Sequence, residues 1–287
     1  MAKQEEKDFQ KFLDENQYSS NGILRYEKLF GRGFVSTGGT ETTEEFVKML
    51  NLKPGQKVLD VGCGIGGSAF YMIKNFGVDV LGVDLSTNMI DIGKQRAVEM
   101  NCEKVEFLIA DITTATNEPA SFDVIYSRDT ILHIAEKEKL FANFLKWLKP
   151  GGQLLISDYC CGEGEHSERF KAYVKQRHYH LLTVPSYGKM IENVGFIEVK
   201  AEDRTQQFTN MLQKEVQRVE GNKEEFLKDF TQEDYDALIK GWKDKLVRCQ
   251  DGDQKWGLIY AKKKSIVFLI SPIRLCQQGT VHESCCT

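Results

Sequence analysis

Short apolar runs alternate with amphipathic segments along the first 160 residues, and this alternation predicts β-strands and α-helices in turn. Parallel strands joined by helices form a doubly wound, mostly parallel α/β sheet, whose ligands bind beyond the carboxyl ends of the strands. The predicted strands are 58–61, 78–84, 105–111, 121–126 and 153–157, and the predicted helices are 66–75, 89–100 (capped by Ser86) and 136–148.

The pattern changes after Tyr159. The segment 205–246 is mostly helical in character, with Leu212, Val216 and Val219 at helical spacing, and we expect it to form a lid. The other predictions are a polar, basic and aromatic segment at 163–179, a helix at 186–193, an edge strand at 196–200, and a last strand at 255–261 that pairs antiparallel at the sheet edge.

The most informative motif is the glycine turn DVGCGIGG at 60–67, which follows the first predicted strand. Glycine allows a tight bend and lets a ligand approach the backbone closely. Gly62, Gly64 and Gly67 fit the G-x-G-x-x-G spacing of dinucleotide sites. With Asp60 in front, the stretch also fits the D-x-G-x-G-x-G spacing of S-adenosylmethionine (SAM) methyltransferases. The turn alone therefore does not choose between hydride and methyl transfer.

Acidic residues end or follow three consecutive strands of the prediction, at Asp60, Asp84 and Asp111. Asp84 lies about 20 residues after the glycine turn, where a strand-end carboxylate reaches ribose hydroxyls. A single aspartate at such a place often only caps a helix or closes a turn. Three in succession, the first directly before a glycine turn, indicate a ligand site.

The composition is that of an ordinary soluble protein. The chain of 287 residues, 41% apolar and 28% charged, can bury one large α/β domain, or one domain with an accessory element. Its net charge of −4 gives no electrostatic footprint for nucleic acid or an anionic membrane. The first twelve residues lack the apolar core of a signal peptide, and no apolar stretch approaches membrane-spanning length. We therefore expect a cytoplasmic protein without nucleic-acid partners or stable membrane insertion.

The eight cysteines show neither a C-x-x-C pair nor metal-ligand spacing. We expect reduced thiols and no metal site. Cys63 lies inside the glycine turn, where a small side chain is tolerated, and we interpret it as structural rather than nucleophilic.

Two sets of segments resemble known families. Over about residues 51–158 the chain resembles the class I SAM-dependent methyltransferases, and over about residues 9–263 it resembles the phosphoethanolamine N-methyltransferase family, which methylates phosphoethanolamine stepwise to phosphocholine. The first resemblance is carried by DVGCGIGG at 60–67, GVD at 82–84, ADI at 110–112 and LKPGG at 148–152. The second is carried by NQY at 16–18, FVSTGG at 34–39, SRDTILH at 127–133, SDYC at 157–160, YVKQRHY at 173–179, GWKDK at 241–245 and KWG at 255–257.

The resemblance implies a class I, Rossmann-like fold with an N-terminal helical segment and a helical lid insertion. It implies one methyltransferase domain over 1–264, with a SAM-binding core at about 50–160 and a substrate lid at about 161–250. Residues 265–287 do not resemble the family, and we expect a disordered tail there. We also expect a monomer that binds SAM and a small phosphobase.

The same resemblance assigns roles to individual residues. It makes His133 the general base and pairs it with Tyr18. Cofactor contacts fall to Ser36, Gly62, Gly64, Asp84, Leu85, Asp111, Ile112 and Arg128. Substrate contacts fall to Gln17, Asp129, Tyr159, Tyr173, Arg177, Tyr179 and Lys245.

Physical chemistry makes these roles sensible. Methyl transfer needs a neutral amine, and a primary amine with a pKa of about 10 requires roughly 4 kcal/mol to lose its proton at pH 7. Histidine titrates nearest that pH, and a tyrosine hydroxyl can orient it. A phosphate needs fixed positive charge, which Arg177 and Lys245 offer. A quaternary nitrogen cannot donate hydrogen bonds, so aromatic faces and a carboxylate such as Asp129 must hold it.

Other functions stay open at this point. The chain also fits a methyltransferase for another small amine or a sterol-like acceptor, for which Arg177 and Lys245 would be dispensable. It fits a non-catalytic SAM-binding regulatory subunit, and the glycine turn alone fits an NAD-linked oxidoreductase. Members of the family have one or two methyltransferase domains, so residue types do not settle which of the three methylations this chain performs.

Overall fold

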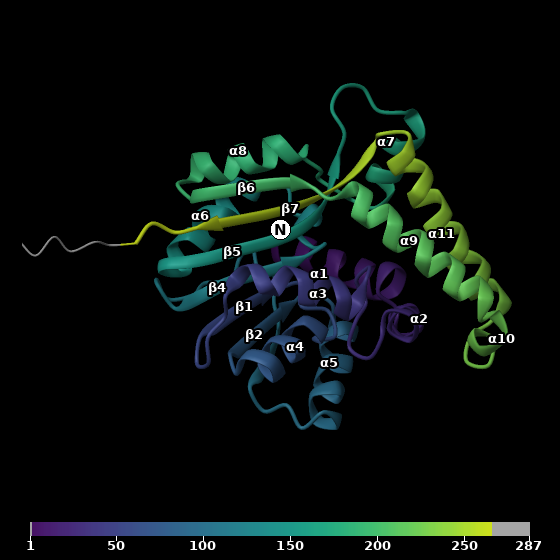
Figure 1. Cartoon of the computed structure of the whole chain (residues 1–287), viewed down its shortest axis with the longest axis horizontal. Coiled ribbons are helices and arrows are strands. Elements are labelled where there is room, and N and C mark those ends of the chain that lie inside the picture. The colour runs from purple at the N-terminus through teal and green to yellow at the C-terminus, as the bar shows by residue number, and fades with distance from the viewer. Residues whose placement is uncertain (1, 266–287) are drawn as a thin grey trace, which may run out of the picture.

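A seven-stranded sheet with helices on both faces organises the chain in the computed structural model, which describes residues 2–265 (Figure 1). The strand order is β3-β2-β1-β4-β5-β7-β6. The first five strands run parallel, and β7 is antiparallel to both of its neighbours. The strands are β1 (Lys57–Val61), β2 (Asp79–Asp84), β3 (Val105–Ile109), β4 (Phe122–Arg128), β5 (Leu148–Cys161), β6 (Ile197–Asp203) and β7 (Gln254–Lys262).

Helices precede the sheet, connect its strands and extend beyond it. The α-helices are α1 (Ala2–Phe12), α2 (Ser20–Phe30), α3 (Gly39–Val47), α4 (Gly67–Phe76), α5 (Thr87–Glu99), α6 (Lys137–Trp147), α7 (Glu168–Gln176), α8 (Val184–Val194), α9 (Thr205–Gly221), α10 (Lys223–Phe226) and α11 (Gln232–Gln250). A π-helix, η1 (Leu13–Gln17), and two 3₁₀ turns, η2 (Lys48–Leu50) and η3 (Ile131–His133), complete the list.

Two apolar clusters form the core, one on each face of the sheet. Successive side chains of a strand point to opposite faces, so Val58 and Leu59 of β1 join different clusters. The cluster around Val58 includes residues of α3, α4, α9 and α11. The cluster around Leu59 includes residues of α6 and α8. Both faces are thus covered, as parallel strands require.

The structure confirms the doubly wound sheet and all the predicted strands, with two corrections. The last strand does not lie at the sheet edge: β7 pairs with both β5 and β6, and β6 is the edge strand. The continuous apolar run from Trp256 to Ala261 is buried throughout, which is the signature of an interior strand. In addition, β5 begins at Leu148 rather than Gln153, because Gly151 and Gly152 exchange backbone hydrogen bonds with Lys263.

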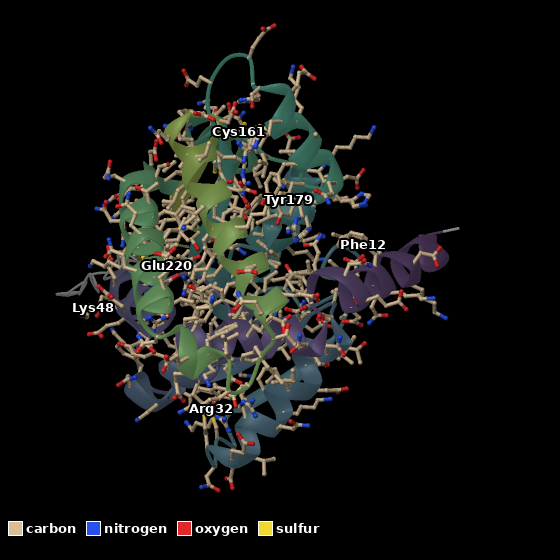
Figure 2. All side chains as sticks on the ribbon, turned by 90° about the vertical axis from the view of Figure 1, so that its right-hand side faces the viewer. Phe12, Arg32, Lys48, Cys161, Tyr179 and Glu220 are labelled. Atoms are coloured by element: carbon tan, nitrogen blue, oxygen red, sulfur yellow. The ribbon has the colours of Figure 1, made fainter. Side chains whose placement is uncertain are left out.

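The predicted lid consists of α9, α10 and α11, which stand beyond one end of the sheet at the right of Figure 1. Figure 2 views the molecule from that side and shows α9 and α11 next to each other, as their mutual packing requires. Leu212, Val216 and Val219 are buried, as their spacing predicted, and pack in one cluster with Trp242 of α11. The expected tail at 265–287 lies outside the described residues, except for Ser265. No helix among residues 2–265 has both the length and the apolar character needed to cross a membrane.

A buried ion pair ties α2 to α5. Glu27 accepts hydrogen bonds from Nε of Arg96 at 2.7 Å and from Nη2 at 2.6 Å, and both residues are 7% exposed. Glu27 Oε1 also accepts the N–H of Gly33, where the loop toward Ser36 begins. Burial acts to raise the pKa of Glu27, but the hydrogen bonds from Arg96 and Gly33 lower it below its usual value. The pair therefore anchors a wall of the site described below.

Replacing Arg96 by Met should reduce the free energy of unfolding by about 3–5 kcal/mol at pH 7, because the Glu27 charge is left buried without its partner. A carboxylate with a lowered pKa stabilises the fold above its unfolded pKa and loses that contribution as the pH falls through its folded pKa. The difference between wild type and variant should therefore shrink toward pH 4. Urea unfolding measures it. Arg32→Met, which removes the exposed ion pair with Glu99, is the control and should cost less than about 1 kcal/mol; equal losses in both variants would contradict the anchoring role.

Candidate active site

One cavity of about 680 Å³ opens beyond the carboxyl ends of β1, β2, β4 and β5, where the strand order reverses between β1 and β4. This is the switch point at which doubly wound sheets bind ligands. Every residue to which the sequence assigned a cofactor, substrate or catalytic role lines this cavity. The geometry thus brings together residues spread from Gln17 to Lys245.

The glycine turn and Asp84 form one end of the cavity. Asp84 accepts the N–H of Gly64 and the N–H of Ser86, both at 2.9 Å, so it joins the turn to the start of α5. Gly62 has φ +69°, and a Cβ there would lie 2.0 Å from Oγ1 of Thr130, so no larger residue fits. The glycine at position 62 therefore allows close packing against Thr130 as well as access for a ligand.

Asp60 supplies a buried acceptor beside this turn. Its side chain is 2% exposed, and its Oδ2 has no hydrogen-bond partner within the described part of the chain. Burial, followed by the charge of Asp84, raises the pKa of Asp60 to about 7. Burial likewise raises the pKa of Asp84 to about 6. Two partly desolvated carboxyl groups at one end of a cavity suit a ligand that brings positive charge and hydroxyl donors.

The loop before α3 covers the cavity between its two ends. Ser36 lies on this loop and lines the cavity. Arg128, 5% exposed, donates from Nη2 to the carbonyl of Thr37 at 2.8 Å and from Nη1 to Oγ1 of Thr43 at 2.9 Å. The guanidinium of Arg128 therefore holds the loop that presents Ser36. The remaining residues assigned to the cofactor, Leu85, Asp111 and Ile112, line the wall next to β2 and β3.

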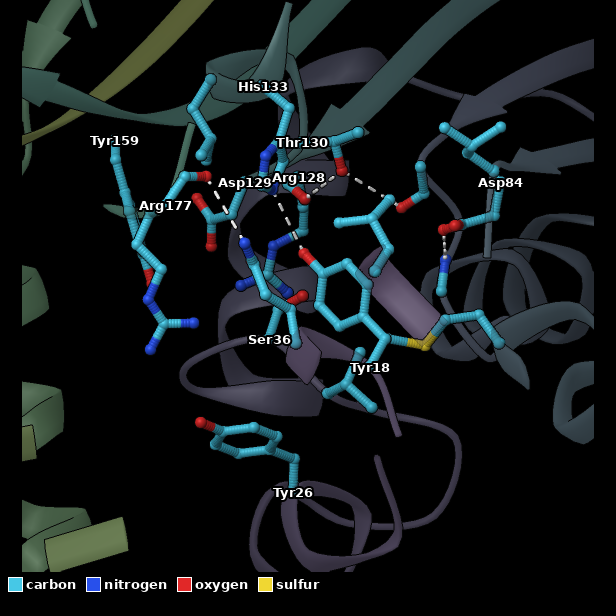
Figure 3. A pocket seen from close by; sticks show the side chains of 18 of the residues that line it. Tyr18, Tyr26, Ser36, Asp84, Arg128, Asp129, Thr130, His133, Tyr159 and Arg177 are labelled. Atoms are coloured by element: carbon cyan, nitrogen blue, oxygen red, sulfur yellow. Dashed lines mark hydrogen bonds between the residues drawn. The ribbon is translucent and has the colours of Figure 1, made fainter. Parts of the chain in front are cut away.

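Tyr18 and His133 meet in the middle of the cavity. Their Oη and Nε2 atoms are 3.4 Å apart, and Figure 3 shows the pair between Asp84 on one side and Arg177 and Tyr159 on the other. The π-helix η1 ends directly before Tyr18, whose carbonyl accepts Nδ2 of Asn88 at 2.9 Å. Burial raises the pKa of Tyr18 well above its usual value, so the hydroxyl keeps its proton.

The imidazole of His133 is neutral in this environment. Burial, reinforced by the positive charges of Lys137 and Arg177, lowers its pKa to about 3. Its Nδ1 atom has no hydrogen-bond partner among residues 2–265. The free protein therefore holds an uncharged base at the centre of the cavity, with Nε2 directed at the Tyr18 hydroxyl.

Aromatic and cationic side chains form the other end of the cavity. The ring of Tyr179 lies 5.0 Å from that of His133 and 5.7 Å from that of Tyr173, centroid to centroid. Lys245 of α11 donates to the Tyr159 hydroxyl at 2.9 Å. Burial, and then the nearby Arg248, lowers the pKa of Lys245 to about 8. A negatively charged ligand beside this buried amine would stabilise its protonated form, so the amine is suited to bind an anion.

Arg177 and Gln17 connect this end with the N-terminal segment. The guanidinium of Arg177 lies 6.0 Å from the centre of the Tyr173 ring, and the electrostatic influence of four tyrosines helps raise its pKa against the effect of burial. Gln17 donates from Nε2 to the Arg177 carbonyl at 3.4 Å. The chain ahead of Tyr18 is thereby linked to the end of α7.

Asp129 faces the cavity in a strained conformation. Its φ is +51°, which is uncommon for a residue other than glycine. Oδ1 accepts the indole N–H of Trp256 at 2.8 Å and the hydroxyl of Ser157 at 3.3 Å. With Oδ1 held in this way, Oδ2 is the oxygen available to a ligand.

Tyr26 and Arg248 are among the cavity residues that the sequence analysis did not name. Tyr26 of α2 lines the cavity, and Figure 3 shows its ring on the same side of the site as Ser36. Arg248 lies one turn after Lys245 on α11, and its guanidinium stacks 3.8 Å from the centre of the Tyr173 ring. The spacing of Lys245 and Arg248 along a helix was the available signal for the second, whereas Tyr26 has the apolar periodicity of an ordinary core residue.

The described residues also bear on the predictions of a structural Cys63 and of no metal site. Cys63 lines the cavity, and burial raises the pKa of its thiol well above the usual value, which supports a structural role. Within residues 2–265, no group of three or more His, Cys, Asp or Glu side chains is arranged to hold a metal ion.

Comparison with known proteins identifies the relatives of this chain. A family model described as a methyltransferase domain matches residues 52–220. The phosphoethanolamine N-methyltransferase of Plasmodium falciparum is 38% identical over 255 residues, which cover 88% of this chain and 95% of that protein. The chain belongs to the phosphoethanolamine N-methyltransferase family. The enzyme of that name from Triticum aestivum is 59% identical over 259 residues, or 90% of this chain and 51% of that protein.

Solved structures place this family member in the same fold. Phosphoethanolamine N-methyltransferase 2 of Haemonchus contortus, solved with phosphomonomethylethanolamine and S-adenosylhomocysteine, matches with a TM-score of 0.87 and 40% identity, covering 90% of this chain and 60% of that one. A sarcosine dimethylglycine methyltransferase described as putative, from Galdieria sulphuraria, shares the fold at a TM-score of 0.69 and 19% identity. The chain thus spans about half to three-fifths of the length of its plant and nematode relatives.

The lowered pKa of Lys245 predicts how anion binding varies with pH. Methyl phosphate, a monoester with a second pKa of about 6, stays a dianion above about pH 7.5. Its affinity for the cavity should fall roughly tenfold or more between pH 7.5 and 9.5, because free Lys245 loses its proton near pH 8. Isothermal titration calorimetry measures this. Lys245→Met should bind weakly with little pH dependence, and Lys243→Met, on the exposed side of α11, should behave as wild type. If Lys245→Met keeps the wild-type pH profile, as Lys243→Met should, the assignment of Lys245 to the anion site is wrong.

Proposed function

We propose that this chain is a SAM-dependent N-methyltransferase that acts on phosphoethanolamine, its mono- and dimethylated forms, or both, toward phosphocholine. One observation carries the proposal: a single cavity joins an acidic, glycine-lined end to a cationic, aromatic end, and the Tyr18–His133 pair stands between them. A related enzyme supports both ligands, since the Haemonchus structure holds a phosphobase together with S-adenosylhomocysteine.

The acidic end fits SAM. The unpartnered carboxyl oxygen of Asp60 and the carboxylate of Asp84 suit a ligand with an amino group, a sulfonium charge and ribose hydroxyls. The remaining walls of the SAM site would be formed by Gly62, Gly64, Leu85, Asp111 and Ile112. Ser36 would contact SAM from the loop that Arg128 holds. When bound, SAM supplies an electrophilic methyl group for an in-line displacement.

The cationic end would hold the phosphate of the acceptor. Arg177 provides a bidentate fork, Lys245 a point charge, and Tyr159, Tyr173 and Tyr179 provide hydroxyl donors. The amine would then extend toward Asp129, whose Oδ2 faces the cavity. A quaternary nitrogen has no N–H group to donate to Asp129. The rings of Tyr179 and His133 can contact it instead through cation–π interactions.

His133 would accept the amine proton, with Tyr18 orienting its ring. A base with a pKa near 3 is too weak in the free protein to deprotonate an ammonium group. A bound phosphate dianion would counter the charge of Arg177, which is one cause of that low pKa, and would therefore raise the basicity of His133. Binding of the substrate would thus strengthen the base that removes its own proton.

The alternative functions require different features of the cavity. A sterol-like acceptor without phosphate has no need for three buried or half-buried cations, Arg177, Lys245 and Arg248, at one end of the site. A non-catalytic SAM-binding subunit has no need for a paired tyrosine and histidine facing the donor. NAD-linked chemistry is disfavoured because the chain belongs to a methyltransferase family.

We further propose one domain over 1–264, with a cofactor core at about 50–160 and a lid at about 161–250. The net charge of −4 argues against nucleic-acid binding, and we propose a cytoplasmic location. The cavity is built from residues of one chain, so a monomer can form a complete site.

Incubation with SAM and each phosphobase tests the proposed function. Phosphoethanolamine, its monomethyl form and its dimethyl form are supplied separately, and mass spectrometry quantifies the products. We expect methyl transfer to at least one of the three and none to ethanolamine, which lacks the phosphate. A chain that binds SAM yet methylates none of the three would refute the proposal.

Replacing His133 by Ala should separate catalysis from cofactor binding. We expect kcat to fall by about 10²- to 10⁴-fold, the usual contribution of a general base. Affinity for S-adenosylhomocysteine, measured by calorimetry, should stay within about twofold because His133 lies away from the glycine turn. Lys139→Ala removes an exposed side chain of α6 and should leave both values near wild type. Equal losses of rate and cofactor affinity in His133→Ala would argue against a base.

A further inference from the structure

Two buried ionisable side chains contact the main chain of η3, the turn that carries His133. Lys137, the first residue of α6, is 4% exposed, and Asp158 of β5 is fully buried. Neither is among the residues that line the cavity, so neither is placed to touch a ligand bound there. A buried cation at the N-terminus of a helix is doubly unfavourable, because burial and the helix dipole both oppose its charge. Such a placement requires compensating contacts.

The main chain of the turn provides these contacts. Nζ of Lys137 donates to the carbonyl oxygens of Ile131 and Ile134, each at 2.6 Å, and these two residues bracket His133 in the sequence. Oδ1 of Asp158 accepts the N–H of Leu132 at 3.1 Å. The Ile131 carbonyl and the Leu132 N–H belong to the same planar peptide unit. The side chains of Lys137 and Asp158 therefore hold opposite edges of one peptide. Burial lowers the pKa of Lys137 and raises the pKa of Asp158 to about 7.

Two further hydrogen bonds fix this arrangement. The hydroxyl of Tyr187, which is fully buried on α8, donates to Oδ2 of Asp158 at 3.1 Å. The backbone N–H of His180 donates to the Leu132 carbonyl at 2.7 Å. Peptide groups on both sides of His133 are thus held by partners from α6, β5 and the segment after α7.

We propose that Lys137 and Asp158 form a positioning clamp, which holds the peptide groups around His133 so that its ring stays opposite the Tyr18 hydroxyl. The clamp rests on the proposed function, in which His133 is the base. Lys137 and Asp158 are positioning residues, since they act through the turn and not on the reacting atoms. A displacement of about 1 Å at a reacting group can cost about 10²-fold in rate, so the clamp should matter for kcat.

The charge of Lys137 also acts on the imidazole. His133 faces Lys137 from α6, and Arg177, His178 and His180 from the end of α7 and the segment after it. The rings of Tyr18 and Tyr179 contact it and carry no charge at neutral pH. Burial is the largest cause of the low pKa of His133, and Lys137 is the next. Neutralising Lys137 should therefore raise the pKa of His133, an effect that purely structural damage would not produce.

Lys137→Met and Lys137→Gln test the clamp in the full chain. Both remove the charge, but Gln keeps a donor for one carbonyl and is better suited to a polar pocket, so it serves if the Met variant folds poorly. Lys146→Met, an exposed lysine on the same helix, is the matched control. The His133 imidazole is titrated by NMR, with its signal assigned by its loss in His133→Gln, and kcat and KM are measured with SAM and phosphobase.

We expect His133 of wild type and Lys146→Met to stay neutral down to the lowest pH at which each is folded. In both Lys137 variants the imidazole should titrate about one pH unit higher or more. The value of kcat should fall about 10- to 100-fold in Lys137→Met and less in Lys137→Gln, because the loss of positioning outweighs the gain in basicity of His133. KM for SAM should stay within about twofold of wild type.

Folded Lys137 variants with the imidazole titration and kcat of Lys146→Met would overturn the proposal. So would a loss of kcat that only follows the loss of folded protein, as seen by circular dichroism, with the titration unchanged. If the wild-type chain methylates no phosphobase, the proposed function fails, and the NMR titration still decides whether Lys137 acts on His133.

Discussion

The site depends on the burial of ionisable groups at one edge of a parallel sheet. Asp60, Asp84, His133 and Lys245 each have a pKa displaced mainly because water has been excluded from around them. In each case the displacement favours the neutral form, which leaves the group able to respond to a charged ligand. The fold supplies this environment by placing α1, α2 and α11 over the carboxyl ends of the strands.

Several residues of the site are held in place by hydrogen bonds from buried side chains. Arg128 holds the loop with Ser36, Trp256 holds Asp129, and Lys137 with Asp158 would hold the turn with His133. Each supporting side chain is buried, so water does not compete for its hydrogen bonds. This division between supporting and reacting residues allows the reacting groups to stay exposed to the cavity and still keep their geometry.

The sequence was sufficient to predict the sheet and a set of site residues that all line one cavity. Alternation of apolar runs with amphipathic segments, and acids after successive strands, located the cofactor end, and family resemblance located Tyr18 and His133. The position of β7 was missed because its pairing partners, β5 and β6, are distant in the sequence and are set by packing. Arg248 and Lys137 were missed because their roles depend on what they stack on or bond to, which spacing along a helix does not reveal. Tyr26 was hidden among apolar residues with the same period.

The most direct test of this account is a crystal structure of the chain with S-adenosylhomocysteine and phosphoethanolamine. We predict the adenosyl moiety against Gly64 and Asp84, the phosphate on Arg177 and Lys245, and the amine within hydrogen-bonding distance of Asp129 or the Tyr18–His133 pair. A phosphate bound at the glycine turn, or an amine directed away from His133, would contradict it.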